Sequence, residues 1–371
     1  MKLRCERDVL VEALSTAGRA AGGRGGTPVQ GGLRLELAGD RLHLAATDLD
    51  LTIQMAVTVA GGGDGACVAP ARLVTDIVRS LEPGAVTVEA EADEIRVRGG
   101  RSQFMVRGFP VSEFPRLNAA TGDQVVLGAA ELAEAVRQVI RAASGDDSRP
   151  MLTGVLLSAE PGGLRLVATD SYRLALRDLV GTTVLAEGQK VLVPARALGE
   201  LQRLLATLGA APEGERQVSL CVGDLDASFE VGSVQLSTRL LEGEFPNYQK
   251  LFPSSYPNRL VVGKSALLDA IRRVKLMAKD ATASVHMAMR AESIELSVAT
   301  QDVGQAREDI EATYEGTELS VAFNPTYLAD GVEAVEGGEV LLETVDAAKP
   351  ATVRSAESED YRYLLMPVRV P

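Results

Sequence analysis

The sequence predicts an α+β protein made of three similar domains in tandem, because four landmarks recur in the same order three times. Each copy runs through an amphipathic helix, a β-hairpin that ends near an Ala-Thr pair, a helix entered through proline, and alternating strands that end near an X-Pro element. The 371 residues also suit two or three domains at the usual ~100–200 residues each. We place the copies at 1–120, 121–250 and 251–371. The pattern alone leaves open three α+β domains that share no task.

Two helices are expected in each copy. The first has apolar residues at i, i+3, i+4 and i+7, which gives it one buried stripe. These first helices are expected within 7–20, 129–143 and 264–278. The second helix follows Pro70, Pro194 or Pro325. Proline near a helix start supplies a suitable φ and lacks only an N–H that would have no partner in the helix.

The Ala-Thr landmark reads ATDLDLTI from Ala46, ATDSYRLA from Ala168 and ATQDVGQA from Ala299. Each copy follows an alternating run that is typical of a β-hairpin, with turns expected at 39–40 and 161–163. We expect Asp48 and Asp170 to cap turns by accepting hydrogen bonds from their own backbone.

The composition is that of an ordinary globular chain, with 46% apolar and 24% charged residues. No apolar run reaches the ~18 residues of a membrane span, and the first residues lack the apolar core of a signal peptide. Cys5, Cys67 and Cys221 are scattered and odd in number, which argues against a disulfide framework or a metal site. These features favour a cytoplasmic protein without a membrane partner.

The net charge of −13 speaks against an evenly basic surface for nucleic acid. Net charge averages over the whole surface, however, and a binding surface needs only a local excess of lysine and arginine. The charge therefore excludes a uniformly basic protein and leaves a locally basic site open.

Five stretches identify a family resemblance: RPMLTGV at 149–155, ATDSYRLA at 168–175, LLEGEFPNYQKLFP at 240–253, FNPTYL at 323–328 and YRYLLMPVRV at 361–370. In this order and at this spacing they resemble the bacterial sliding clamps, the beta subunits of DNA polymerase III. The resemblance covers the whole chain.

The resemblance implies three domains of the processivity fold per chain and two chains closed head to tail into a homodimeric ring. Helices would line the hole and sheets would form the outer wall. Such a ring is not an enzyme. It slides on double-stranded DNA without sequence preference and tethers the polymerase III catalytic subunit, repair polymerases and other partners through short peptide motifs. An ATP-driven clamp loader would open it.

By the same resemblance, partner peptides bind in a groove between the second and third domains. Such a groove should be mainly apolar, with a few polar groups that fix the orientation of the peptide. The corresponding residues here are Leu152, Thr169, Ser171, Tyr172, Arg173, Leu174, Pro246, Lys250, Leu251, Asn324, Tyr327, Pro350, Met366, Pro367, Val368 and Arg369. Without the resemblance, core packing is the simpler interpretation of Leu174 and Met366.

A basic lumen inside an acidic outer wall would reconcile the net charge with DNA binding through phosphates. The candidates on helix faces and loops are Arg24, Arg72, Arg137, Arg141, Arg196 and Arg203. For any one of them, a solvated helix face is an equally simple interpretation.

The resemblance also places the ring interface between the first domain of one chain and the third domain of its partner. It sets Phe104 and Val106 against Leu276 and Met277. The alternative is an edge strand and an ordinary helix face, although an exposed edge is a liability unless it is paired.

Some positions depart from the family pattern. Tyr172 stands where many clamps carry histidine, and Asp146 lies in a loop that often reaches toward DNA. The departures fit an actinobacterial-type clamp that has drifted. Two other hypotheses stay open: a specialised second copy that gives resistance to an antibiotic peptide bound in the groove, and a peptide-docking scaffold that works off DNA.

No catalytic residue, cofactor or metal is expected. The chain has no G-x-x-x-x-G-K-[ST] phosphate loop and no G-x-S-x-G nucleophile turn. Its two histidines, His43 and His286, fall in different copies. A hydrolytic or nucleotide-binding role is therefore set aside.

Overall fold

The computed structural model describes residues 1–22, 27–117, 122, 124–208, 216–278, 283–300 and 303–368. The chain divides into two compact units. The first unit comprises Met1–Ala130 and Arg196–Leu240, and the second comprises Glu131–Ala195 and Leu241–Pro371. The middle third of the chain is thus shared between the units, and the three domain boundaries stay a prediction.

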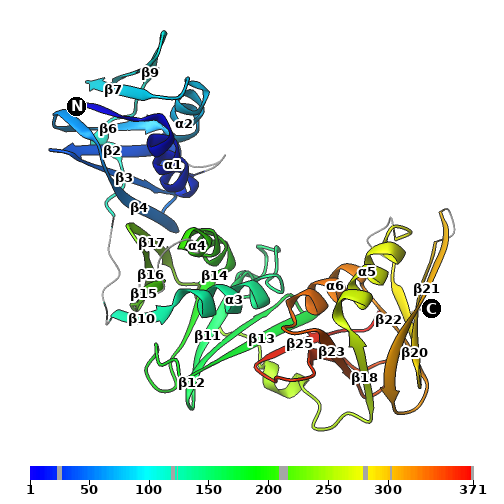
Figure 1. Ribbon diagram of the computed structural model, residues 1–371. Helices are drawn as coiled ribbons and strands as arrows, with labels where there is room; N and C mark the ends of the chain where they lie inside the picture. The colour runs from blue at the N-terminus through cyan, green and yellow to red at the C-terminus, as the bar shows by residue number, and fades with distance from the viewer. Residues whose placement is uncertain are drawn as a thin grey trace. The chain divides into compact units, whose positions relative to one another are not determined.

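Six α-helices occur in the described residues, two in each predicted copy: α1 (Arg7–Ala17), α2 (Ala71–Ser80), α3 (Ala129–Ile140), α4 (Ala195–Thr207), α5 (Lys264–Lys275) and α6 (Pro325–Ala334). The buried stripe predicted for the first helix is confirmed at Leu10, Ala13, Leu14 and Ala17 of α1. Helix α1 packs beside α2 and on strands β3 and β4, and α5 packs in the same way beside α6 and on β20 and β21 (Figure 1).

The helix-entry prolines have two different roles. Pro325 is the first residue of α6, and the side chain of Asn324 caps this helix by accepting from the backbone N–H groups of Thr326 and Tyr327. Pro70 and Pro194 instead end the strands that precede α2 and α4. The predicted helix entry is confirmed at all three prolines, because α2 and α4 begin directly after Pro70 and Pro194 and α6 begins at Pro325 itself.

The first unit contains two sheets. A five-stranded sheet has the order β5-β1-β7-β8-β9, and an eight-stranded sheet has the order β10-β15-β16-β17-β4-β3-β2-β6. Their strands are β1 (Lys2–Glu6), β2 (Gly32–Ala38), β3 (Arg41–Thr47), β4 (Leu51–Thr58), β5 (Ala60–Gly63), β6 (Gly65–Pro70), β7 (Ala85–Glu91), β8 (Glu94–Gly99), β9 (Ser102–Arg107), β10 (Gln124–Gly128), β15 (Gln217–Val222), β16 (Asp226–Val231) and β17 (Val234–Arg239).

The second unit contains one twelve-stranded sheet with the order β14-β11-β12-β13-β25-β24-β23-β18-β21-β20-β19-β22. Its strands are β11 (Gly154–Glu160), β12 (Gly163–Thr169), β13 (Arg173–Val180), β14 (Lys190–Pro194), β18 (Asn258–Gly263), β19 (Val285–Arg290), β20 (Ser293–Thr300), β21 (Gly304–Glu315), β22 (Leu319–Phe323), β23 (Glu339–Thr344), β24 (Ala351–Ser355) and β25 (Tyr361–Leu365). The hairpin turns predicted at 39–40 and 161–163 are confirmed between β2 and β3 and between β11 and β12.

Two strand pairs join one predicted copy to the next. In the first seam, β17 pairs antiparallel with β4, so that Leu236 faces Ile53 and Thr238 faces Leu51. In the second seam, β25 pairs antiparallel with β13, with Leu365 opposite Arg173. Each seam thus joins the last strand of one copy to the fourth strand of the copy before it. A continuous hydrogen-bonded sheet therefore crosses each boundary between copies.

The last strand and helix α6 pack tightly beside the second seam. Tyr363 of β25 is 2% exposed, and its hydroxyl donates to the carbonyl of Tyr327, 2.9 Å away. A Cβ added to Gly331 of α6 would lie 2.4 Å from the ring of Tyr363. Glycine is therefore required at this point of α6 by a close approach between helix and sheet.

None of the described helices has the length and apolar character that crossing a bilayer demands.

We predict that Gly331→Ala lowers the stability of the second unit by about 1–3 kcal/mol, because the new methyl group overpacks the ring of Tyr363. Intrinsic helix propensity alone would favour alanine by about 1 kcal/mol, so the two effects have opposite signs. Urea unfolding followed by circular dichroism measures the change. Gly338→Ala is the control, since a Cβ there meets nothing within 4 Å. Equal or higher stability of Gly331→Ala would contradict the packing described.

Candidate functional site

The turn between β12 and β13 carries the middle Ala-Thr motif. Thr169 Oγ1 accepts from the backbone N–H of Ser171 at 3.2 Å and donates to the carbonyl of Arg173 at 2.7 Å. Asp170 Oδ1 accepts from the backbone N–H groups of Tyr172 and Arg173. These bonds hold Ser171 at a φ of +80°, which is uncommon for a residue other than glycine. The predicted capping role of Asp170 is confirmed, and the turn leaves the side chain of Tyr172 62% exposed.

Arg173 is enclosed by partners from two predicted copies. Its Nε donates to Asp170 at 3.0 Å, and its Nη1 donates to Asp330 of α6. The guanidinium carbon lies 4.2 Å from the ring centroid of Tyr327, a favourable cation–π position. The side chain is only 10% exposed. Arg173 therefore fixes the turn and α6 relative to each other, and its charge is already satisfied before any peptide arrives.

The chain that follows β25 lies against this turn. The backbone N–H of Met366 donates to the carbonyl of Tyr172 at 2.9 Å, and that of Val368 donates to the carbonyl of Ala322 at 2.7 Å. Met366 and Val368 are 42% and 37% exposed, and Leu251 is 49% exposed. Leu251 ends the 3-10 segment Tyr248–Leu251, and Tyr248 packs in one cluster with Leu174, which follows the turn. Exposed apolar side chains that gather in one region are typical of an interaction surface.

Other predicted groove residues are buried in the structure. Leu152 and Leu174 are 4% and 2% exposed. Leu174 packs with Tyr248 and Leu364 in an apolar cluster on one face of the twelve-stranded sheet. These residues support the exposed side chains from beneath. Core packing, the alternative that the sequence left open, describes Leu174 correctly, whereas Met366 is at the surface.

The remaining predicted groove residues fall at the edges of this region. Pro246, Lys250 and Ser171 are exposed, and Pro350, Pro367 and Asn324 are partly exposed. Ala351 pairs with Leu365 in the β24–β25 ladder, which puts Pro350 beside Met366. Asn324 is occupied in capping α6. Arg369 lies outside the described residues.

The arginines predicted to face DNA are mostly paired with carboxylates. Arg137 pairs with Glu134 and also donates to the backbone carbonyls of Glu333 and Ala334. Arg141 pairs with Asp330 and Glu333, and the hydrogen bond from Arg141 lowers the pKa of the Glu333 carboxyl. These pairs link α3 to α6 within the second unit (Figure 1).

In the first unit, two of the arginines predicted to face DNA are also paired with carboxylates. Arg196 pairs with Asp48, and Arg203 pairs with Glu200. Arg72 is exposed and has no hydrogen bond or ion pair to any residue that the structure describes, and Arg24 lies outside the described residues. Exposed ion pairs contribute only about 0–1 kcal/mol, so phosphates could compete for these arginines. Their DNA contact stays a prediction.

The residues predicted for the ring interface lie on the edge strand β9 of the first unit and directly after helix α5 of the second unit. Phe104 and Val106 are on β9, the last strand of the five-stranded sheet, and Val106 is 6% exposed. In the other unit, Leu276 follows α5 and is 75% exposed, and Met277 accepts a hydrogen bond from Thr300 through its carbonyl. The sequence interpretation missed Met105, which is 56% exposed on the opposite face of β9.

The carboxylates of α6 were also missed. Asp330 and Glu333 bind arginines that lie more than 150 residues earlier in the chain. Their i, i+3 spacing on a helix was the only available signal, and it marks one face without naming a partner. Within the described parts of the chain, no group of three or more His, Cys, Asp or Glu side chains could hold a metal ion.

Comparison with known proteins matches the whole chain to one family. Models of the DNA polymerase III beta subunit match its N-terminal domain at residues 1–118, its central domain at 126–247 and its C-terminal domain at 249–369. The chain is 31% identical to the beta sliding clamp of Streptomyces coelicolor and 31% identical to that of Synechococcus elongatus, over 100% of both chains in each case.

Solved structures agree with these matches. The structure is similar to the DNA polymerase sliding clamp of Bacillus subtilis, with a TM-score of 0.92, 28% identity and 100% of both chains covered. It is also similar to a sliding clamp of Bartonella birtlesii bound to griselimycin, with a TM-score of 0.91, 29% identity and 100% of both chains covered. The predicted fold class of three tandem clamp domains is thereby confirmed.

We predict that Arg173→Lys destabilises the second unit by about 1.5–3 kcal/mol, since lysine cannot reproduce the bonds to two carboxylates or stack as a plane on Tyr327. Urea unfolding gives the change. The control is Arg272→Lys, because the pair between Arg272 and Asp269 is more than half exposed on both sides and exposed pairs contribute little. Equal effects of the two substitutions would show that Arg173 does not fix the turn.

Proposed function

We propose a function from the premise that this chain belongs to the family of DNA polymerase III beta subunits, the beta sliding clamps. We infer that it forms a closed ring around double-stranded DNA. The ring slides without sequence preference and tethers the replicative polymerase, which makes DNA synthesis processive. The clamp loader, repair polymerases and other partners use the same peptide site.

The peptide site is supported by the exposed apolar side chains around the β12–β13 turn. Tyr172, Leu251, Met366 and Val368 are all more than a third exposed, while the turn beneath them is rigid. A short extended peptide with leucine or phenylalanine anchors would cover these side chains. Methionine suits a surface that must repack around several partners. This cluster is the single observation that carries the proposed tether.

Closure of the ring is supported by the repeated seams. Within the described residues, β9 pairs with no strand other than β8. The stretch 304–311 of β21 pairs with β20 on one side only, because β18 joins β21 at Ala312–Glu315. Strand β9 is the last strand of the first copy, and β21 is the fourth strand of the third copy. Each internal seam likewise pairs a last strand with a fourth strand. A third seam, between two copies of the chain, would use the same pairing and remove both open edges.

The internal seams also set the register of this third seam. Hairpin pairing makes Phe104 and Val106 equivalent to Leu236 and Thr238. The first seam sets Leu236 and Thr238 opposite Ile53 and Leu51. The residues of β21 equivalent to Ile53 and Leu51 are Ala306 and Gly304. Val106 should thus face the partner's Gly304, and Met105 should face the partner's Gln305 on the outer surface.

We further propose that the chain acts in the cytoplasm and is not an enzyme. Cys5, Cys67 and Cys221 are buried, and none of the three forms a disulfide, which suits a reducing compartment. A tether needs no group that makes or breaks bonds. The relatives carry the plain name of sliding clamp, so neither a specialised antibiotic-resistant copy nor a scaffold that works off DNA is favoured.

We predict that a peptide of the Gln-x-x-Leu-Phe kind binds the wild type with a micromolar dissociation constant. The pair of substitutions Tyr172→Ala and Met366→Ala should weaken it at least about tenfold, since truncated apolar anchors at interfaces commonly cost more than 1 kcal/mol. Isothermal titration calorimetry gives both constants. Val180→Ala is the control, because Val180 is 75% exposed at the far end of β13. Binding that survives the double substitution would refute this site.

We predict that Met105→Cys combined with Gln305→Cys gives a disulfide between two chains under mild oxidation. Residues directly opposite on paired strands have Cβ atoms about 4.5–5.5 Å apart, close to the range a disulfide needs. Non-reducing gel electrophoresis detects the product. In the control, Met105→Cys with Ala306→Cys, the two thiols point to opposite faces of the sheet. Cross-linking of the control alone, or of neither pair, would rule out the register.

A further inference from the structure

A hollow of about 400 Å³ lies on the outer face of the first seam. It is contained in the first unit and is built by β4, β17, the chain before β4, and the segment that follows β9. Its lining residues are Thr47, Leu49, Asp50, Thr52, Pro115, Arg116, Leu117, Leu225, Asp226, Ser237, Thr238 and Arg239. None of these residues belongs to the peptide site proposed above.

The turn at this hollow repeats the turn that underlies the peptide site. Thr47 Oγ1 accepts from the backbone N–H of Leu49 at 3.0 Å, as Thr169 does from Ser171. Asp48 Oδ1 accepts from the backbone N–H groups of Asp50 and Leu51, at 3.1 and 2.8 Å. Leu49 has a φ of +85°, which is strained for a bulky residue. The strained turn holds the leucine side chain 55% exposed at the rim.

The rest of the lining also corresponds to the peptide site, position by position. Strand pairing makes Arg239 and Asp226 equivalent to Met366 and Pro350. It also makes Thr52 and Ser237, which we call the floor of the hollow, equivalent to Leu174 and Leu364. In the second seam these floor positions are leucines buried under Tyr248 and its neighbours. In the first seam they carry hydroxyl groups, with Ser237 buried and Thr52 partly exposed.

One floor hydroxyl lacks a partner. Ser237 is 8% exposed, and its Oγ has no hydrogen bond to any residue that the structure describes. The neighbouring hydroxyls of Thr47 and Thr52 bond each other at 2.8 Å. A buried polar group without a hydrogen bond is costly and rare in native proteins. Ser237 belongs to the lining of the hollow, so a ligand seated there could supply the missing hydrogen bond.

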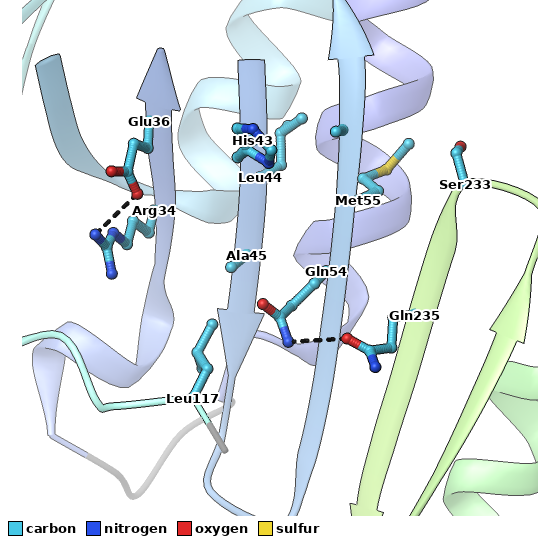
Figure 2. A pocket seen from close by; sticks show the side chains of 11 residues that line it. Arg34, Glu36, His43, Leu44, Ala45, Gln54, Met55, Leu117, Ser233 and Gln235 are labelled. Carbon is cyan, nitrogen blue, oxygen red and sulfur yellow. Dashed lines mark hydrogen bonds and ion pairs between the residues drawn. The ribbon is translucent and has the colours of Figure 1, made fainter. Parts of the chain in front are cut away.

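The adjacent hollow also has one buried polar atom without a partner, because Arg34 Nε makes no hydrogen bond to any residue that the structure describes. It measures about 370 Å³ and shares Leu117 with the first hollow. Figure 2 shows its polar side chains paired with one another: Arg34 donates to Glu36 at 2.9 Å, and Gln54 donates to Gln235 at 3.4 Å across the seam. Thr52 and Ser237 are the next outward-facing pair along these strands. Of these two unpartnered atoms, Arg34 Nε can only donate a hydrogen bond, whereas the Ser237 hydroxyl can both donate and accept.

The walls and rim indicate the kind of side chain that fits. Leu49 and Leu225, 55% and 64% exposed, provide apolar walls on either side of the hydroxyl floor. The rim carries two acids, Asp50 and Asp226, and two bases, Arg116 and Arg239, so a charged side chain gains nothing overall. The carboxamide of a glutamine side chain both donates and accepts hydrogen bonds. The methylene groups of the same side chain can pack between Leu49 and Leu225.

We propose that the first seam is a second docking site for an extended peptide segment of a partner protein, anchored by a glutamine side chain that bonds the hydroxyl floor at Ser237. It differs from the leucine- and phenylalanine-binding site in anchor chemistry, so the two sites would not compete. The choice of a partner peptide as occupant rests on the proposed function, whereas the hollow and its open hydrogen bond do not.

The test uses the full chain with ¹³C-labelled leucine methyl groups, observed by methyl-TROSY NMR. The probe is acetyl-Ala-Gln-Ala-amide, and the matched control is acetyl-Ala-Met-Ala-amide, which has nearly the same shape but no carboxamide. The methyl signals of Leu49 and Leu225 should shift saturably with the glutamine probe. Binding of the methionine peptide at these signals should be about three- to ten-fold weaker, the effect of one hydrogen bond.

Two variants separate binding from folding. Ser237→Ala should weaken the glutamine probe by the same factor and leave stability unchanged or slightly higher, because it removes a buried group that has no partner. Leu49→Gly should weaken binding while relieving the strained φ. Met366→Ala should have no effect on the Leu49 and Leu225 signals.

Either of two results would overturn the proposal. The Leu49 and Leu225 signals could stay fixed up to the solubility limit of the probe, or they could respond equally to glutamine and methionine. The Leu251 signal, followed with an Ala-x-x-Leu-Phe peptide that lacks the glutamine, reports separately on the peptide site of the second unit. A response there with none at Leu49 rejects the second site and leaves the proposed tether standing.

Discussion

The antiparallel pairing of a last strand with a fourth strand is the constraint on which the structure depends. It occurs twice within the chain, between β17 and β4 and between β25 and β13. Each pairing continues a sheet across a boundary between copies, and each places a turn of the Ala-Thr motif beside the chain that leaves the last strand. The seams thus create both the continuity of the sheets and the sites at their outer faces.

The repetition explains why the same local geometry serves different chemistry. At both seams a threonine and an aspartate accept backbone N–H groups and hold the next residue at a left-handed φ. What differs is the floor. Leu174 and Leu364 make the second seam apolar, whereas Thr52 and Ser237 make the first seam polar. A repeat can therefore keep its backbone geometry and change the chemical character of the surface at each junction.

Much of the fold could be predicted from sequence because its signals are local. The stripe of α1, the hairpin turns and the cap at Asp170 all depend on residues within a few positions of one another. The hydrogen bonds from Arg137 to carbonyls of α6 and the ion pair of Arg141 with Glu333 could not be predicted, because their partners lie about 190 residues away. The sequence could not decide between core packing and the groove for Leu174 for the same reason, since Tyr248, which packs in the same cluster, lies more than 70 residues further along the chain.

The paired arginines change how DNA binding should be understood. Arg137, Arg141, Arg196 and Arg203 each hold a carboxylate, so contact with phosphate means exchanging one anion for another. Such contacts are weak and sensitive to salt. Retention on DNA must then come from closure of the ring around the duplex, with electrostatic attraction as a secondary contribution.

Retention on DNA of different topology tests this account most directly. The chain is loaded onto nicked circular plasmid with ATP and the clamp loader of the same organism, and the DNA-bound fraction is isolated by gel filtration. The account predicts that the chain co-elutes with the circle in high salt and is released when a restriction enzyme cuts it. A chain that stays bound to the linear product, or that salt removes from the intact circle, would contradict the ring.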